Sequence, residues 1–198
     1  DLVTHATLAD IKTAPISALA HSNDNRRFAY STIIPTQASN PRDPYNEQQP
    51  GPSSGSNDIR IHDLTTGQLV ATIAWDAKVE TLAFTPDNKE LIVLSKSELA
   101  RIDSESGAIL HSRPFAFSSS RNSIDSYRSK VSSDGRLLSL AGFSGDLRLF
   151  NLPTLQPINK LTPGLAHALY NHGFTIALAP DSTSFLSIDF LGNVRQWA

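Results

Sequence analysis

Short runs in which apolar and polar residues alternate recur along the chain, separated by turns rich in Asp, Asn, Ser and Gly. Four segments share one layout, an alternating run, an Asp-centred turn and a second apolar run: SALAHSNDNRRFAYS, ETLAFTPDNKELIVL, YRSKVSSDGRLLSLA and FTIALAPDSTSFLSI. Alternation with a period of two over so few residues predicts β-strands rather than helices. The turn aspartates are Asp24, Asp87, Asp134 and Asp181, and the last two intervals are both 47 residues.

Each unit continues with further apolar runs. Third runs lie at 59–63, 99–103, 147–151 and 194–198, and fourth runs follow in the first three units at 69–73, 109–113 and 157–161. Units of four antiparallel strands, here named a to d, that repeat about every 45 residues are typical of β-propellers. The sequence therefore predicts an all-β propeller with about four blades in this chain, either a complete ring or part of a larger one.

The repeats resemble those of the WD-repeat family. The Pro-Asp turns, the Thr-Gly hairpin at 66–67 and Trp197 at the end of a third strand carry this resemblance, and the turns are also close to the Pro-Asp repeats of TolB-like propellers. The repeats are degenerate, because the other units have different residues where the family has Trp: His62, Ile102 and Phe150. The family's Gly-His pair before strand a is not evident, and its Asp in the b–c turn is replaced by Ser144 in the third unit and Leu191 in the fourth. The family's buried His–Ser–Trp–Asp hydrogen-bond set therefore cannot be complete in any unit. The resemblance implies a ring that usually has seven or eight blades.

The strand pattern also divides the chain. We expect a strand d at 1–9, blades at 16–73, 79–113 and 126–161, and an incomplete blade of strands a to c at 174–198. The segment 1–9 should complete a blade whose other strands come from the C-terminal unit or from a preceding blade. Residues 35–57 form an insertion with five of the twelve prolines and few apolar residues, which predicts a mobile loop.

The long connections all join strand b to strand c or strand d to the next strand a. In an up-and-down meander, such connections emerge on one face, and long loops on a rigid scaffold often carry function. The resemblance points to the same face as the contact surface. The candidate partner-binding residues there are Tyr45, Trp75, Arg121, Phe143, Tyr170, His172 and Phe190, since aromatic residues and Arg are common interface anchors. Packing against a neighbouring blade is the alternative for these aromatics, above all for Phe143 and Phe190.

Composition narrows the possible functions. The 198 residues are 39% hydrophobic and 18% charged, with a formal net charge of −2 and no Cys. The missing Cys excludes disulfides and thiolate metal sites, and the near-neutral charge argues against nucleic-acid binding. No apolar run approaches the roughly 18 residues of a membrane span. The compartment stays open, with a slight preference for an exported protein because Cys is absent.

The chain lacks the sequence patterns of a catalytic site. Its six His form no H-x-H or H-E-x-x-H pattern, and neither a G-x-S-x-G elbow nor a phosphate-binding loop occurs. We therefore expect no enzyme activity, no metal and no cofactor, and interpret the chain as a protein-interaction scaffold within a larger assembly. Two alternatives remain: a propeller that accompanies or gates an enzyme domain outside this segment, and a propeller that binds a small molecule or glycan. Further blades or a second copy are possible partners for closing the ring.

Overall fold

The computed structural model confirms the all-β fold class. It describes residues 13, 15–33, 57–115, 127–142, 147–158, 175–188 and 194–198. Within these ranges the chain forms strands and turns and no helix, so none of the described segments is a helix that could span a membrane.

Four antiparallel sheets contain all the strands of the described residues. The first sheet consists of β1 (Ile16–His21), β2 (Arg27–Thr32), β3 (Asn57–Asp63) and β4 (Leu69–Trp75). The second consists of β5 (Val79–Phe84), β6 (Glu90–Ser95), β7 (Glu98–Asp103) and β8 (Ile109–Pro114). The third consists of β9 (Tyr127–Val131), β10 (Leu137–Gly142), β11 (Leu147–Asn151) and β12 (Gln156–Pro157). The fourth has three strands, β13 (Thr175–Leu178), β14 (Phe185–Ile188) and β15 (Val194–Trp197).

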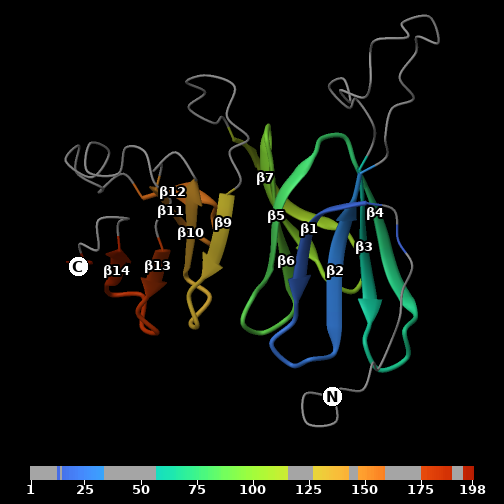
Figure 1. Ribbon diagram of the computed structural model, residues 1–198, viewed down its shortest axis with the longest axis horizontal. Coiled ribbons are helices and arrows are strands. Elements are labelled where there is room, and N and C mark those ends of the chain that lie inside the picture. The colour runs from blue at the N-terminus through green and yellow to red at the C-terminus, as the bar shows by residue number, and fades with distance from the viewer. Residues whose placement is uncertain are drawn as a thin grey trace, which may run out of the picture.

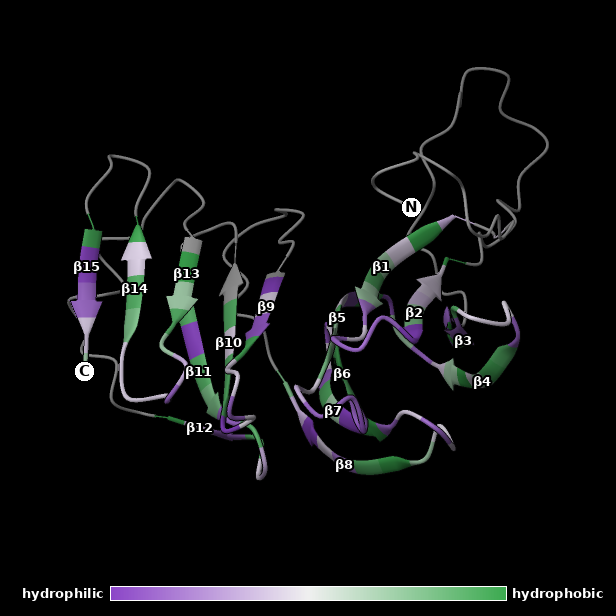
Figure 2. Ribbon diagram, turned by 90° about the horizontal axis from the view of Figure 1, so that it is seen from below, coloured by the Kyte–Doolittle hydropathy of each residue, from purple (hydrophilic) through white to green (hydrophobic). Residues whose placement is uncertain are grey.

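The sheets are arranged like the blades of a propeller. Strand order within each sheet follows the chain, and the first strands of successive sheets contact one another, β1 with β5, β5 with β9 and β9 with β13. These strands form the inner side of an open arc, whose first and last sheets lie at opposite ends (Figures 1 and 2). β3 already begins at Asn57, so the last residue of the predicted insertion belongs to the sheet. The predicted strand at 1–9 and the rest of the insertion lie outside the described residues.

The hydrophobic core lies between successive sheets rather than within one layer. One buried cluster joins the first and second sheets through residues such as Ile59, Ile61, Val79 and Leu91. A second cluster joins the second and third sheets, and a smaller third cluster joins the third and fourth. Both faces of a middle sheet are therefore buried. This explains why β6 reads as the continuous apolar run Leu91–Leu94 instead of a strict alternation.

The four Asp-centred turns have one conformation. The residue after each Asp has a left-handed φ, which is 60° at Asn25, 61° at Asn88, 71° at Gly135 and 59° at Ser182. Asn and Gly adopt this conformation at low cost, which explains their choice at three of the four turns. The carboxylates bond within their own turns, as Asp87 does when it accepts hydrogen bonds from Thr85 Oγ1 at 2.7 Å and Lys89 N at 3.2 Å. This confirms the interpretation of these aspartates as turn formers.

Two of the sequence-predicted core residues lie at the position where the resemblance expects Trp. His62 is buried and stacks on Phe28 and Tyr30, with ring centroids 5.1 and 5.6 Å away. Trp197 is partly buried in the cluster between the last two sheets and stacks on Phe185. Both side chains pack as predicted, His62 in a buried position and Trp197 in part.

Candidate functional site

The two ends of the sheets differ in kind. The turn end carries the a–b and c–d turns, at 22–26, 64–68, 85–89, 104–108, 132–136, 152–155 and 179–184. The loop end carries the b–c and d–a connections, at 33–56, 76–78, 96–97, 115–126, 143–146, 158–174 and 189–193. All the tight a–b turns lie together at the lower side of Figure 1. The long connections therefore join strands at the opposite end, as strand parity predicts.

Many polar side chains of the turn end, above all the turn aspartates, are bonded within the protein. In the c–d turns, Asp63 Oδ1 accepts from the backbone N–H of Thr65 and Thr66, both at 2.8 Å, and Asp103 Oδ1 does the same with Glu105 and Ser106. Hydrogen bonds also link neighbouring turns. Asn23 N donates to Asn88 Oδ1 at 2.7 Å between the first two sheets, and Ser182 Oγ donates to Asp134 Oδ1 at 2.5 Å between the last two.

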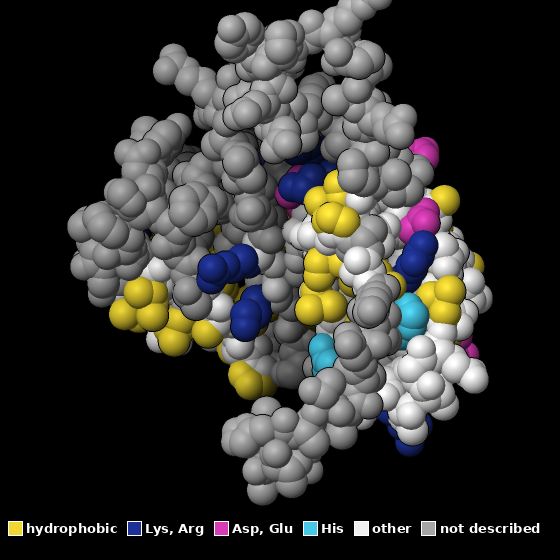
Figure 3. All heavy atoms as spheres, turned by 45° about the vertical axis from the view of Figure 1, so that its right-hand side comes forward, with side chains coloured by type: hydrophobic (Ala, Val, Ile, Leu, Met, Phe, Trp, Pro, Cys, Tyr) yellow, Lys and Arg dark blue, Asp and Glu magenta, His cyan; other side chains and the backbone are white. Residues whose placement is uncertain are grey.

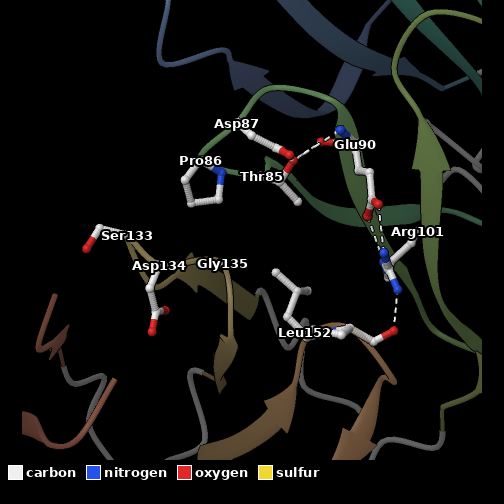
Figure 4. Close-up of a pocket in the computed structure, with 10 residues that line it drawn as sticks. Thr85, Pro86, Asp87, Glu90, Arg101, Ser133, Asp134, Gly135 and Leu152 are labelled. Atoms are coloured by element: carbon white, nitrogen blue, oxygen red, sulfur yellow. Dashed lines mark hydrogen bonds and ion pairs between the residues drawn. The ribbon is translucent and has the colours of Figure 1, made fainter. Parts of the chain in front are cut away.

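Arginine side chains connect each of the first two sheets to the next. Arg27 donates to Ser104 Oγ at 2.8 Å and to Glu105 Oε1 at 3.0 Å. Arg101 donates to both carboxylate oxygens of Glu90 at 2.7 Å and also to the Pro153 carbonyl of the third sheet (Figure 4). The hydrogen bond to Glu90 is the main cause that raises the pKa of Arg101. These guanidinium groups are therefore occupied in holding the sheets together.

Cavities open between neighbouring sheets at the turn end. One of about 210 Å³ lies between the third and fourth sheets and is lined mainly by apolar residues, among them Leu137, Phe185 and Trp197. A second, of about 480 Å³, lies between the second and third sheets, with Asp87, Glu90, Arg101 and Asp134 in its wall (Figure 4). Another of about 420 Å³ lies between the first and second sheets and is lined by both acidic and basic residues. The charged groups named here bond to each other or to their own turns, and the described residues contain no group of three metal-ligating side chains. These cavities lie where neighbouring blades meet.

Acid should destabilise the fold through the turn aspartates. Hydrogen bonds from Ser182 and Ser132 lower the pKa of Asp134 from 3.8 to about 2. Turn hydrogen bonds also lower the pKa of Asp24, Asp63, Asp87, Asp103 and Asp181. A folded-state pKa below the unfolded value means that this stabilisation is complete above 3.8 and is lost as pH falls toward 2. We expect the melting temperature to fall over this window and Asp134→Asn to reduce the slope. A melting temperature that stays constant from pH 5 to 2 would contradict this expectation.

The described part of the loop end includes one of the predicted binding residues, Trp75. It is the last residue of β4, has an exposed fraction of 4% and belongs to the core cluster between the first two sheets. Trp75 therefore packs between the sheets, which was the alternative for this residue, and offers little contact area to a partner. The other six, Tyr45, Arg121, Phe143, Tyr170, His172 and Phe190, lie outside the described residues.

The structure shows two contacts of charged side chains at the loop end that the sequence pattern did not predict. Lys78 Nζ lies 3.2 Å from Glu80 Oε2, and the Glu80 side chain is only 4% exposed. The guanidinium carbon of Arg148 lies 4.9 Å above the ring centre of Phe115, which links β11 of the third sheet to the end of the second. The Lys78–Glu80 pair lies where the short 76–78 connection enters β5, and the Arg148–Phe115 contact lies where the long 115–126 connection leaves the second sheet. The long connection therefore begins from a residue that is held against the third sheet.

Comparisons with known proteins support the fold and nothing finer. No protein family matches the sequence, and no curated protein is similar to it. Among solved structures, the chain is similar to the Dos1 propeller, with a TM-score of 0.59 and 12% identity over 92% of this chain. It is also similar to the computationally designed Ika4 protein, with a TM-score of 0.56 and 14% identity over 95% of this chain. The chain spans 41% of the Dos1 propeller chain and 93% of the Ika4 chain. These likenesses, together with the sheet order, identify the architecture as a β-propeller.

Proposed function

We propose that this chain is a non-catalytic scaffold that binds a protein partner through its loop end. The observation that carries the proposal is the unequal use of the two ends of the sheets. At the turn end, the aspartates accept hydrogen bonds from their own turns and the arginines bridge neighbouring sheets. Polar groups that are already bonded within the fold offer little net gain to a partner, because each new contact replaces an existing one.

The loop end supplies the complementary features. Its three long connections leave strands that are fixed by the core, and they carry Tyr45, Arg121, Tyr170 and His172. Tyr and Arg provide large contact areas and several hydrogen-bond donors, and for this reason they are frequent hot spots. Arg121 and Tyr170 replace the buried Trp75 as the preferred anchors, and Phe143 and Phe190 belong to the shorter b–c connections.

The WD-repeat resemblance gives further support. Trp197 Nε1 donates to Ser187 Oγ at 2.9 Å, which joins two members of that family's hydrogen-bond set in the fourth sheet. WD-type propellers commonly act as interaction platforms, and the same role is proposed for this chain.

The proposal is tested by comparing variants of the two ends. Arg121→Ala with Tyr170→Ala should weaken binding of a partner captured from the native source by about 2 kcal/mol or more, roughly 30-fold in Kd. The matched control is Arg26→Ala with Lys89→Ala, since both residues are exposed on the turn end. The control should retain the partner, and both variants should melt like the parent protein. If only the turn-end variant lost the partner, the binding surface would be at the turn end and the proposal would be contradicted.

A further inference from the structure

Leu19 has an exposed apolar side chain, although the equivalent residue of each later sheet contacts the sheet before it. This position lies five residues before the turn Asp, and the later sheets have Leu82, Ser129 and Ile176 there. Leu82 and Ile176 are each 5% exposed and pack in the clusters toward the preceding sheet. Ser129 Oγ lies 2.9 Å from Thr81 Oγ1 of the second sheet. Leu19, in the first sheet, is 60% exposed.

Val194 in the last sheet is likewise exposed, at a position that contacts the following sheet in the earlier sheets. It pairs with Ile188 at the start of strand c, just as Leu99 pairs with Leu94 and Ile59 with Ser31 in earlier sheets. At this position, Ile59 and Leu99 are fully buried and Leu147 is 8% exposed, each in a cluster toward the following sheet. Val194 is 60% exposed, and its neighbours on the same sheet face, Leu186 and Ile188, are 43% and 44% exposed.

The exposed side chains at the two ends of the arc thus occupy the positions that form the two halves of a contact between successive sheets elsewhere. Among the described residues, the first sheet has no preceding neighbour and the last sheet has no following one, and they lie at opposite ends of the arc (Figure 2). Figure 3, which brings the side of the first sheet forward, shows exposed hydrophobic side chains among polar ones there. We propose that a second copy of this chain covers both ends, with the last sheet of each copy packed against the first sheet of the other.

A second copy of the chain can cover the exposed face of the first sheet and that of the last sheet at the same time. Head-to-tail contacts between identical chains close into a ring when the rotation allows it, and two copies related by a two-fold axis make two identical contacts. The aligned part of this chain is 41% of the Dos1 propeller chain, so a propeller of that size has room for two arcs like this one. The arrangement would bury the side chains of Leu19, Leu186, Ile188 and Val194, whose exposure is otherwise unfavourable in water.

A polar group at the turn end supports the same arrangement. The residue after the turn Asp exchanges a hydrogen bond with the preceding sheet at Asn88, which accepts from Asn23, and at Ser182, which donates to Asp134. Asn25 holds this position in the first sheet and is exposed, and no side-chain hydrogen bond of Asn25 is found among the described residues. Its amide is placed to make the equivalent bond to the last sheet of a second copy.

The test measures the mass of the protein in solution by light scattering and sedimentation over a range of concentrations. The unmodified chain should be a two-copy particle. Leu19→Asp and Val194→Asp should each lower its association at least tenfold, because each puts a carboxylate into both contacts.

The control variant is Ile109→Asp, which changes an apolar residue of similar exposure, 54%, on β8 away from both ends. It should remain a two-copy particle, and circular dichroism should show that all variants keep their strands. A monomeric parent protein would overturn the proposal. If the parent protein were monomeric and Leu19→Asp also had a lower melting temperature, the first and last sheets would instead pack against each other within one chain. An unchanged association of both Leu19→Asp and Val194→Asp would overturn it as well.

Discussion

Replacing Gly107 by Ala should destabilise the protein by about 3 kcal/mol, because two separate costs add at this residue. Gly107 closes the c–d turn of the second sheet with a φ of +73°, a conformation that costs an L-residue about 1–2 kcal/mol. A Cβ placed there would also lie 2.9 Å from Cγ1 of Ile73 in the first sheet. Ile73 is buried and cannot move freely, so the added methyl group would push the two sheets apart.

Gly67 provides the matched control for this prediction. It holds the equivalent position in the first sheet with a φ of +70°, and a Cβ there would meet no atom within 4 Å. Gly67→Ala should therefore cost only the backbone term, about 1 kcal/mol. Denaturant unfolding of both variants measures the difference, and Ile73→Ala should reduce the cost of Gly107→Ala to that of Gly67→Ala. Equal costs at the two glycines would show that the contact between the sheets does not resist the added methyl group.

Truncating Leu155 should have a similarly large effect, about 3 kcal/mol for Leu155→Ala. Leu155 is fully buried in the cluster between the second and third sheets. It also has a φ of 53° at the end of the third c–d turn, where the other two turns have Gly67 and Gly107. The backbone penalty of a non-glycine residue is accepted here because the leucine side chain fills the space between the sheets.

The comparison of Leu155→Ala with Leu155→Gly tests this explanation. Both variants lose the buried side chain, but Gly relieves the left-handed backbone and Ala does not. Leu155→Gly should therefore be more stable than Leu155→Ala by about 1 kcal/mol, the reverse of the usual order. The free energy of unfolding from urea titrations gives the sign. An alanine variant more stable than the glycine variant would mean that the backbone here is not strained.

The sequence predicted the local structure well because its signals are local. Alternation with period two requires only that one side of a strand be covered, and the turns are specified by residues such as Asp24 and Asn25 that bond or bend within a few positions. The strand order and the incomplete last sheet followed from counting these runs. The binding residues were harder to predict from the sequence. An aromatic residue at the end of a strand, such as Trp75, follows the same sequence pattern whether it binds a partner or packs against a blade.

The sequence by itself determined the strands, their turns and the end of the sheets from which each connection leaves. Only the tertiary structure decided which side chains are covered, since burial depends on whether another sheet stands beside the strand. Leu19 and Leu82 occupy the same position of the repeat, but Leu82 is buried by the sheet before it and Leu19 has no such neighbour among the residues that the structure describes. The bridges from Arg27 and Arg101 likewise join residues that are distant in sequence, and they exist because packing brings one sheet against the turn of the next.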